Sequence, residues 1–372
     1  MLKEDDQKVG INDITLSKLA YLSEKYQIPI TDLIVLCLNL RGISVESSKE
    51  YKDKNINRAR YNLDLIADSM SIFRASAVSP NTPFKLIDMQ ILIENVVIGE
   101  VHNFVNDTCD ETYFRKNGLH LTLNSNSRSK CSGCKFCGTY TLNSDDANDL
   151  TSEVKLKNKI EEIMKSRNKE DLTWLHSIGA VTGCFKEEKD VIDHLIMIKN
   201  VFSEYGFDGE IQYIGSQICS RKGLERLAKS GQFSLYLTVE CFENRQQLMR
   251  KEKTAITLER GREILKDAKE LGMDTSFLYI LGLDSIKGMK DEFRKYKNVI
   301  TRHPLINIFQ NYVSEHERLR DSDAMYIDYY INAMKIIEDI YLDTKMRPRL
   351  WENYRSPWTT KYGKEAIDID RI

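Results

Sequence analysis

The sequence has no long apolar run and no excess of charge of one sign. Hydrophobic residues make up 41% of the 372 positions, but no stretch approaches the ~20 residues that a membrane-spanning helix needs. The start of the chain, MLKEDD, is not the apolar segment of a signal peptide. Because 54 basic and 56 acidic residues are mixed along the chain, no strong field favours nucleic acid or an anionic membrane. We therefore expect a cytoplasmic protein without a nucleic-acid or membrane partner.

The sequence also lacks the cysteine pattern of a secreted disulfide framework. Five of its eight cysteines are scattered singly along the chain, at Cys37, Cys109, Cys184, Cys219 and Cys241. Secreted disulfide scaffolds are short and dense in cysteine. This chain is long enough to bury a large core instead, so we expect free thiols in a reducing compartment.

The other three cysteines form one cluster. Cys131, Cys134 and Cys137 follow closely after the alternating apolar stretch 118–124. Thiolates this close together select zinc or an iron–sulfur cluster. Structural zinc sites nearly always use four protein ligands, and the sequence has neither a second CxxC nor a His pair further on. The number of thiols favours a [4Fe–4S] cluster with one iron left open, with a zinc knuckle or an ordinary exposed cysteine cluster as the alternative.

The segment from Cys134 to Cys137, with Phe136 inside it, resembles the second half of the CxxxCxΦC motif of the radical S-adenosylmethionine (radical SAM) superfamily. Only two residues separate Cys131 from Cys134, whereas the family motif has three. The resemblance implies that the open iron binds S-adenosyl-L-methionine (SAM) and that Phe136 packs beside its adenine. It also implies an oxygen-sensitive enzyme that receives electrons from a flavodoxin- or ferredoxin-type protein and acts on a small-molecule substrate.

The N-terminal region, residues 1–105, is predicted to be a helical cap followed by a β-hairpin. Apolar residues recur at helical spacing over Ile14–Leu40 and again over Ile56–Arg74. Thr31 or Asp32 is expected to cap the second of two helices in the first stretch. The hairpin is expected over Phe84–Phe104, where two apolar runs flank a polar turn.

Strands and helices alternate after the cysteines. The expected strands are 172–181, 210–214, 235–240, 275–281 and 305–312, and the expected helices are 153–167, 187–205, 222–230, 258–272 and 291–302. With the strand before the cysteines they make six βα units, which predict an α/β fold, a partial (βα)6 TIM-like barrel over residues 106–320. A C-terminal helical tail, residues 321–372, follows. It contains a helix at 323–342 and a segment at 347–358, rich in aromatic residues and arginine, that packs on the barrel or clamps a carboxylate or phosphate.

Chemistry in such barrels gathers at the carboxyl edge of the strands. The barrel pattern resembles radical SAM barrels of the biotin synthase and hydrogenase-maturase type. This resemblance implies that Glu240, at the end of the fourth strand, contacts the amino acid part of SAM and that Arg260 pairs with the SAM carboxylate. A strand-end carboxylate and a solvated helix arginine are the alternatives. Thr182 and Gly183 would offer backbone carbonyls to the SAM ammonium, and Ser216 is expected at the same edge.

Several alternatives stay open. Cys184, Cys219 and Cys241 fall just past strand ends, where they either pack in the core or bind a second cluster. The short spacing from Cys131 to Cys134 also fits an unusual SAM cleavage that transfers an aminocarboxypropyl group. From a different class, the chain could be a zinc- or iron–sulfur-binding regulator that uses its N-terminal helices. Little room remains outside the barrel for a cobalamin domain, so cobalamin-dependent methyl transfer is not expected.

Overall fold

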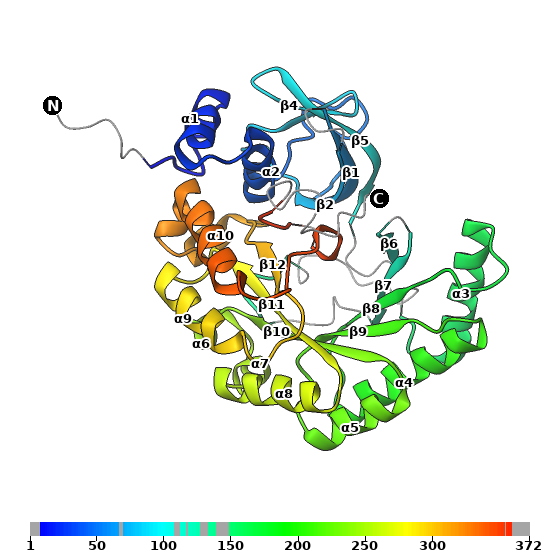
Figure 1. The fold of residues 1–372 in the computed structure, drawn as a ribbon. Coiled ribbons are helices and arrows are strands. Elements are labelled where there is room, and N and C mark those ends of the chain that lie inside the picture. The colour runs from blue at the N-terminus through cyan, green and yellow to red at the C-terminus, as the bar shows by residue number, and fades with distance from the viewer. Residues whose placement is uncertain are drawn as a thin grey trace.

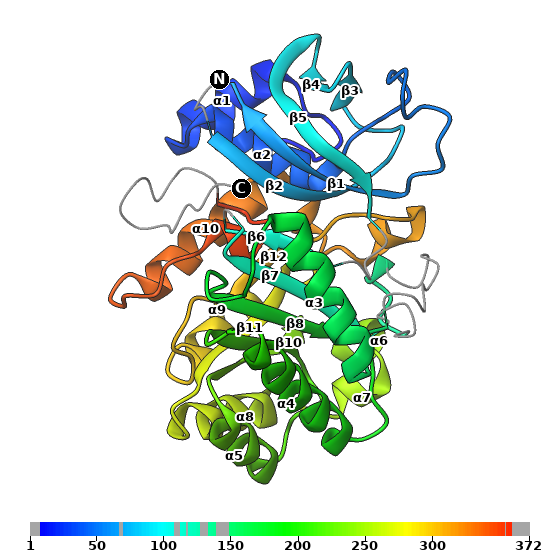
Figure 2. The ribbon, with the colours of Figure 1, turned by 90° about the vertical axis from the view of Figure 1, so that its right-hand side faces the viewer.

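The computed structural model describes residues 8–66, 70–107, 112–116, 118–126, 133–138, 149–353 and 355–358. Over these residues the strands form two sheets, one of five strands in the order β2-β1-β5-β4-β3 and one of seven in the order β12-β11-β10-β9-β8-β7-β6. Figures 1 and 2 show the five-stranded sheet at one end of the molecule and the helices α4, α5 and α8 at the other. In the described part of the chain, no helix is both long and apolar enough to cross a membrane.

The two predicted N-terminal helices are present as α1 (Leu16–Tyr26) and α2 (Ile30–Arg41). The predicted cap of α2 is wrong, because the helix begins directly after Pro29, and Thr31 and Asp32 lie buried within it. Proline before the first helical residue fixes the backbone direction without a side-chain cap. Helix α2 is buried on almost every side, and it packs against α1 and β2 beside the N-terminal sheet (Figure 1).

The helix predicted over Ile56–Arg74 is wrong, since this stretch contributes two antiparallel strands, β1 (Arg58–Leu65) and β2 (Met70–Ala77). In β1 the apolar residues alternate and are fully buried, which is the spacing of a strand with one core face. The predicted hairpin is confirmed. Its strands are β4 (Gln90–Ile93) and β5 (Val96–Asn106), and the short strand β3 (Lys85–Ile87) pairs beside β4. Glu94 and Asn95, which connect β4 to β5, both have the positive φ angles of a tight hairpin turn.

The second sheet is a curled α/β sheet. Its strands are β6 (Tyr113–Arg115), β7 (His120–Asn126), β8 (Ser177–Thr182), β9 (Glu210–Gly215), β10 (Phe233–Glu240), β11 (Asp274–Leu281) and β12 (Leu305–Ile308). Neighbours from β7 to β12 are parallel, and β6 adds antiparallel at the edge. The helices between the parallel strands are α3 (Glu153–Arg167), α4 (Glu188–Glu204), α5 (Arg221–Ser230), α8 (Leu258–Glu270) and α9 (Ile286–Tyr296), with the short helices α6 (Arg245–Leu248) and α7 (Lys251–Thr254) after β10. The five longer helices line the outside of the curl (Figure 1) because each buries one apolar face, as α8 does with Gly261, Ile264, Leu265 and Ala268.

Most predicted boundaries after the cysteines lie within a few residues of the observed ones, and four differ by more. The strand expected from Leu172 begins only at Ser177, because the chain turns at Leu175, whose N–H donates to the Leu172 carbonyl. Helix α9 begins five residues before the predicted start, because the Ser285 side chain caps it, and it ends at Tyr296, six residues before the predicted end. Strand β12 ends at Ile308, four residues before the expected end.

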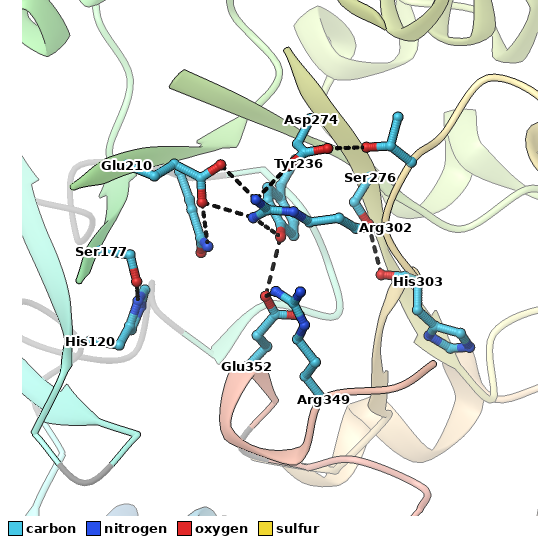
Figure 3. Close-up of polar contacts among 12 residues, drawn as sticks. His120, Ser177, Glu210, Tyr236, Asp274, Ser276, Arg302, His303, Arg349 and Glu352 are labelled. Carbon is cyan, nitrogen blue, oxygen red and sulfur yellow. Dashed lines mark hydrogen bonds and ion pairs between the residues drawn. The ribbon is translucent and has the colours of Figure 1, made fainter. Parts of the chain in front are cut away.

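The C-terminal region contains α10 (Ile327–Tyr341), which packs on α9, and a 3-10 turn at Leu350–Glu352. This turn reaches the amino ends of the strands (Figure 3), where the Tyr236 hydroxyl donates to Glu352 at 3.2 Å. Beside it, Arg302 pairs with both carboxylate oxygens of Glu210 at 2.8 Å and with Asp274. Charged groups that pair in this way fill the amino end of the curl.

Candidate functional site

A cavity of about 190 Å³ lies inside the curl, lined by the carboxyl ends of several strands and reaching Arg115 and Glu352 towards the amino side. Its walls come from the cysteine loop, the ends of β8 to β12, helix α7, the N-terminal sheet and the C-terminal segment. The described lining residues include Arg58, Tyr113, Arg115, Thr122, Phe136, Cys137, Gly138, Thr182, Gly183, Cys184, Tyr213, Gly215, Ser216, Gln217, Thr238, Glu240, Arg250, Lys253, Asn307, Tyr312, Glu352 and Arg355. The cysteine loop and the strand ends therefore meet where the sequence predicts chemistry.

The described part of the cysteine loop, residues 133–138, forms a turn tied to the short helix α6. The Cys137 N–H donates to the Cys134 carbonyl at 3.1 Å, and the Lys135 N–H donates to the Leu248 carbonyl at 2.8 Å. Gly133 has φ of +101°, a conformation that glycine adopts without strain. These contacts hold Cys134 and Cys137 at the mouth of the barrel.

The two described cysteines of the motif lie in different surroundings. Cys134 is buried with Phe136 in a small apolar cluster that includes Met249 and Phe309, and burial raises the pKa of its thiol to about 11. A thiol in such a place ionises when a metal binds it. Cys137 is half-buried and lines the cavity. Soft sulfur donors shielded from water fit an iron–sulfur cluster.

The third predicted ligand, Cys131, lies outside the described residues. Across the described part of the chain, no three His, Cys, Asp or Glu side chains lie close enough together to share a metal ion.

The three cysteines that follow strand ends, Cys184, Cys219 and Cys241, have separate surroundings. Cys184 lines the cavity and contacts the Arg250 guanidinium, Cys241 is buried with its sulfur 3.6 Å from that of Met249, and the backbone N–H of Cys219 donates to Glu188.

The structure brings Thr182, Gly183 and Ser216 together along one wall of the cavity. This wall is shaped by Gln217, whose side chain accepts from the Phe185 N–H at 3.0 Å and donates to the Phe185 carbonyl at 2.8 Å. The amide therefore ties the loops after β8 and β9 to each other, and backbone groups at the strand ends face the cavity in a fixed arrangement.

Glu240 ends β10 in a left-handed backbone conformation, with φ of +66°. The pairing register with β11 shifts between Thr238 and Glu240, as at a β-bulge, which re-aims a side chain. A non-glycine residue held at positive φ costs free energy and often marks a functional position. The Glu240 carboxylate lines the cavity and accepts from the Lys253 ammonium at 2.8 Å, and both side chains are mostly buried.

The structure does not bring Arg260 to this cavity. Its guanidinium donates to Glu263 at 2.9 Å and to the Cys219 carbonyl at 2.6 Å. Its side chain is 42% exposed, on the outer side of the loop after β9. The cationic groups that do lie beside Glu240 and the cysteine loop are Lys253 and Arg250.

Sequence reasoning missed most of the cationic lining. Lys253 belongs to α7, a four-residue helix too short to show an apolar period. Arg58 lies in a stretch that was predicted to be a helix, and no strand was predicted at Arg115. Arg355 belongs to the segment 347–358, and the aromatic and arginine-rich composition of that segment was the sequence feature that indicated a place near the site.

No protein-family model matches the chain, and no curated protein matches it. Among solved structures, it is similar to SuiB from Streptococcus suis bound to the precursor peptide SuiA, with 17% identity and a TM-score of 0.39 over 60% of this chain and 46% of SuiB. A radical SAM methyltransferase from Sphaerobacter thermophilus matches over 89% of this chain and 93% of its own, with 12% identity and a TM-score of 0.39.

The radical SAM methyltransferase TsrM from Kitasatospora setae, with cobalamin and a [4Fe–4S] cluster bound, matches over 51% of this chain and 36% of its own, with 10% identity and a TM-score of 0.33. The matched regions span less than half of SuiB and of TsrM. Because all of these TM-scores are low, function has to be argued from the residues of the site.

Proposed function

We propose that the chain is a radical SAM enzyme that holds a [4Fe–4S] cluster through Cys131, Cys134 and Cys137. The observation that carries the proposal is the single cavity into which Phe136 and Cys137 of the cysteine loop and Glu240 of β10 all project. In a barrel, such a site at the carboxyl edge is the usual place for chemistry. When bound, the cluster would supply the electron for reductive cleavage of SAM, the chemistry that would let the enzyme take a hydrogen atom from a small-molecule substrate.

The protein's own residues bind and orient SAM. The Glu240 carboxylate would accept from the SAM ammonium, with the Thr182 carbonyl beside it, and Phe136 would pack against the adenine. Lys253, which Glu240 holds at 2.8 Å, is the nearest cation for the SAM carboxylate. A zwitterion bound between an acid and a base gains charge-assisted hydrogen bonds at both ends.

The apolar cluster around Cys134 would keep water away from the reacting atoms. Its members, including Met249, Leu283 and Phe309, are buried between the cysteine loop and the ends of β10 to β12. Exclusion of water protects a reactive intermediate from side reactions. The electron would come from a flavodoxin- or ferredoxin-type protein docked near the cysteine loop.

One alternative rests on a specific observation, the two-residue spacing between Cys131 and Cys134. A shorter loop would place SAM differently on the iron, so that a different sulfur–carbon bond breaks and an aminocarboxypropyl group is transferred. The two outcomes leave different products. Anaerobic incubation with SAM and dithionite gives 5′-deoxyadenosine in the first case and methylthioadenosine in the second.

The ligand set is tested by anaerobic reconstitution. We expect about four iron and four sulfide per chain in the wild type and their loss when Cys131, Cys134 and Cys137 are all replaced by alanine. Cys219→Ala is the matched control, because that thiol lies outside the cavity lining and should leave the cluster intact. A triple variant that keeps its iron and sulfide contradicts the assignment, and zinc without sulfide supports the regulator instead.

A further inference from the structure

Part of the cavity lining is built from arginine and tyrosine. We call Arg58, Arg115, Arg355, Tyr113 and Tyr312 the arginine wall; all five line the cavity. The three arginines come from β1, from β6 and from the C-terminal segment, so parts far apart in sequence converge here. Each of them is at most 8% exposed. Burying three guanidinium groups in one place is costly unless anions compensate them.

Arg115 is the most informative member of the arginine wall. Its Nε and Nη2 donate to the Thr122 hydroxyl at 3.0 and 2.8 Å, and its Nη1 donates to the Glu352 carbonyl at 2.7 Å. All three contacts go to neutral acceptors, although the residue is only 4% exposed. Within the described residues, this buried cation has no carboxylate in ion-pair contact.

Arg58 and Arg355 lie on Tyr312. Each guanidinium carbon is 5.5 Å from the centre of the Tyr312 ring, within reach of a cation–π contact. Arg58 also pairs with Asp107 at 2.6 Å. The Nε of Arg355 donates to the Ile308 carbonyl at 3.1 Å, and its Nη1 donates to the Tyr312 hydroxyl. The ring and its contacts hold the two guanidinium groups in fixed positions at the cavity.

The described lining of the cavity carries more positive than negative charge. Its cationic side chains are Arg58, Arg115, Arg250, Lys253 and Arg355, and its carboxylates are Glu240 and Glu352. Glu240 pairs with Lys253. The Glu352 carboxylate accepts from Tyr236 and from Arg349 at 3.3 Å, and burial raises its pKa. Within the described residues, Arg58 of the arginine wall is paired with Asp107, whereas the acceptors of Arg115 are neutral.

The arginine wall lies against the cysteine loop. A Cβ atom added to Gly138 would come within 2.7 Å of the Tyr312 ring, so the loop backbone, one residue after Cys137, packs directly on that ring. The Tyr312 side of the arginine wall, with Arg58 and Arg355, is thus beside the cysteine loop.

We propose that the arginine wall binds the carboxylate or phosphate of an anionic organic substrate. The inference names the substrate class of the proposed radical SAM site and in that sense rests on it, but the anion site itself depends only on this chain's residues. Guanidinium groups that line one cavity recognise planar or tetrahedral oxyanions through paired hydrogen bonds. SAM, with Glu240 and Lys253 as its own acid and base, would leave the arginine wall to the substrate.

Inorganic phosphate is the probe. We expect it to bind the anaerobically reconstituted protein at one site by calorimetry and to raise the melting temperature. Arg115→Gln and Arg355→Gln should each weaken phosphate binding about tenfold or more. The matched control is Arg318→Gln, at an exposed position outside the cavity lining, and it should change binding less than about twofold. Arg115→Lys, which keeps the charge, should restore part of the affinity and shows that a loss in Arg115→Gln is not a folding defect.

A second arm separates the substrate anion from the carboxylate of SAM. We expect phosphate to bind equally well with saturating S-adenosylhomocysteine, and displacement by that compound would overturn the proposal. Absent binding, or binding unchanged in both arginine variants, would overturn it as well. Failure of the radical SAM assignment looks different, because the cluster and SAM cleavage would be missing while arginine-dependent phosphate binding persisted.

Discussion

Glu240 is the residue whose geometry is hardest to explain by packing alone. It holds a left-handed backbone at a strand end, and its carboxylate is paired inside the cavity. If it receives the SAM ammonium, Glu240→Gln removes a charge-assisted contact worth about 1.5–3 kcal/mol, so SAM should bind about tenfold to a hundredfold more weakly. Anaerobic titration of the cluster-loaded protein measures this. Glu252→Gln, an exposed acid on the neighbouring helix α7, is the control and should bind SAM as the wild type does.

If the cavity binds SAM, a second pair of variants identifies the cation that pairs with the SAM carboxylate. Lys253→Met should weaken SAM binding about tenfold or more, because Lys253 lies beside Glu240. Arg260→Ala should change it less than about threefold, since that guanidinium is bound to Glu263 and to the Cys219 carbonyl. A large loss in Arg260→Ala with none in Lys253→Met would restore the role that the sequence resemblance gave to Arg260.

A buried acid outside the cavity gives a prediction about pH. Asp284 accepts backbone N–H groups of Phe242 and Glu243, and burial raises its pKa from the usual 3.8 to about 6. Between these values the folded state binds more protons than the unfolded one, so the stability that Asp284 contributes is lost as pH rises. Asp284→Asn removes this dependence.

The free energy of unfolding of Asp284→Asn, relative to the wild type, should therefore rise by up to about 3 kcal/mol between about pH 4 and about pH 7. Urea denaturation at the two ends of this range measures the change. Asp291→Asn, an exposed position on α9, should show almost no such trend. A difference for Asp284→Asn that stays flat with pH would mean that this carboxylate is solvated in the folded protein.

At the scale of single residues, the sequence predicted those parts of the site that follow strand ends. Phe136, Thr182, Ser216 and Glu240 all reach the cavity, because parallel strands bring their carboxyl ends to one edge whatever the details of packing. Arg115 reaches the same cavity from an antiparallel edge strand. The residues around Arg115 in the sequence do not indicate that it reaches the cavity, because its position there depends on the tertiary fold.

At the scale of secondary structure elements, the main error was the helix predicted over Ile56–Arg74. The alternation of Ala59, Tyr61, Leu63 and Leu65 was visible in the sequence. Arg58 and Arg60 are also buried, since they pair with Asp107, so the first half of β1 is covered on both faces. The barrel elements were predicted better because each repeats a strand, a polar turn and a helix with one apolar face.

The junction between α2 and β2 depends on Gly42. It ends α2 with φ of +69°, and a Cβ there would lie 2.2 Å from the Ala77 carbonyl oxygen of β2. Gly272 also has a positive φ, of +80°, but nothing lies within 4 Å of an added Cβ. Both alanine substitutions pay for the left-handed backbone, about 1–2 kcal/mol, and Gly42→Ala must also push two elements apart.

We therefore expect Gly272→Ala to destabilise the protein by about 1 kcal/mol and Gly42→Ala by about 3 kcal/mol or more. Chemical denaturation at fixed pH measures both. Because the two positions share the backbone conformation, their difference reports the close approach of α2 and β2. If both variants lost the same free energy of unfolding, α2 and β2 would be able to move apart at Gly42 without an energetic cost.

At the scale of the whole molecule, the N-terminal sheet, the barrel and the C-terminal segment are held by shared buried contacts. Gln310, after β12, accepts from the Ala77 N–H of β2 at 2.5 Å and donates to the Asn39 carbonyl of α2 at 2.8 Å. The Asn39 side chain in turn donates to the Ser356 carbonyl at 2.9 Å. The arginine wall takes residues from all three parts, so the cavity requires their assembly.

Trp358 anchors the C-terminal segment in this assembly. It is 1% exposed, its indole N–H donates to Glu338 of α10 at 2.9 Å, and its ring packs edge-on to His303 at 5.4 Å. Trp358→Ala leaves a large cavity and should lower the free energy of unfolding by about 3–5 kcal/mol. Trp174→Ala is the control, because that ring is only half-buried and should cost less.

Trp358 also holds in place the segment that carries Arg355, three residues earlier. If the C-terminal segment is part of the binding site, Trp358→Ala should weaken phosphate binding about tenfold, measured at a temperature where the variant is still folded. Trp174→Ala should leave that affinity unchanged. A Trp358→Ala protein that is destabilised but binds phosphate normally would show that Arg355 is positioned by Tyr312 and Ile308 alone, and that the segment beyond it serves only the stability of the fold.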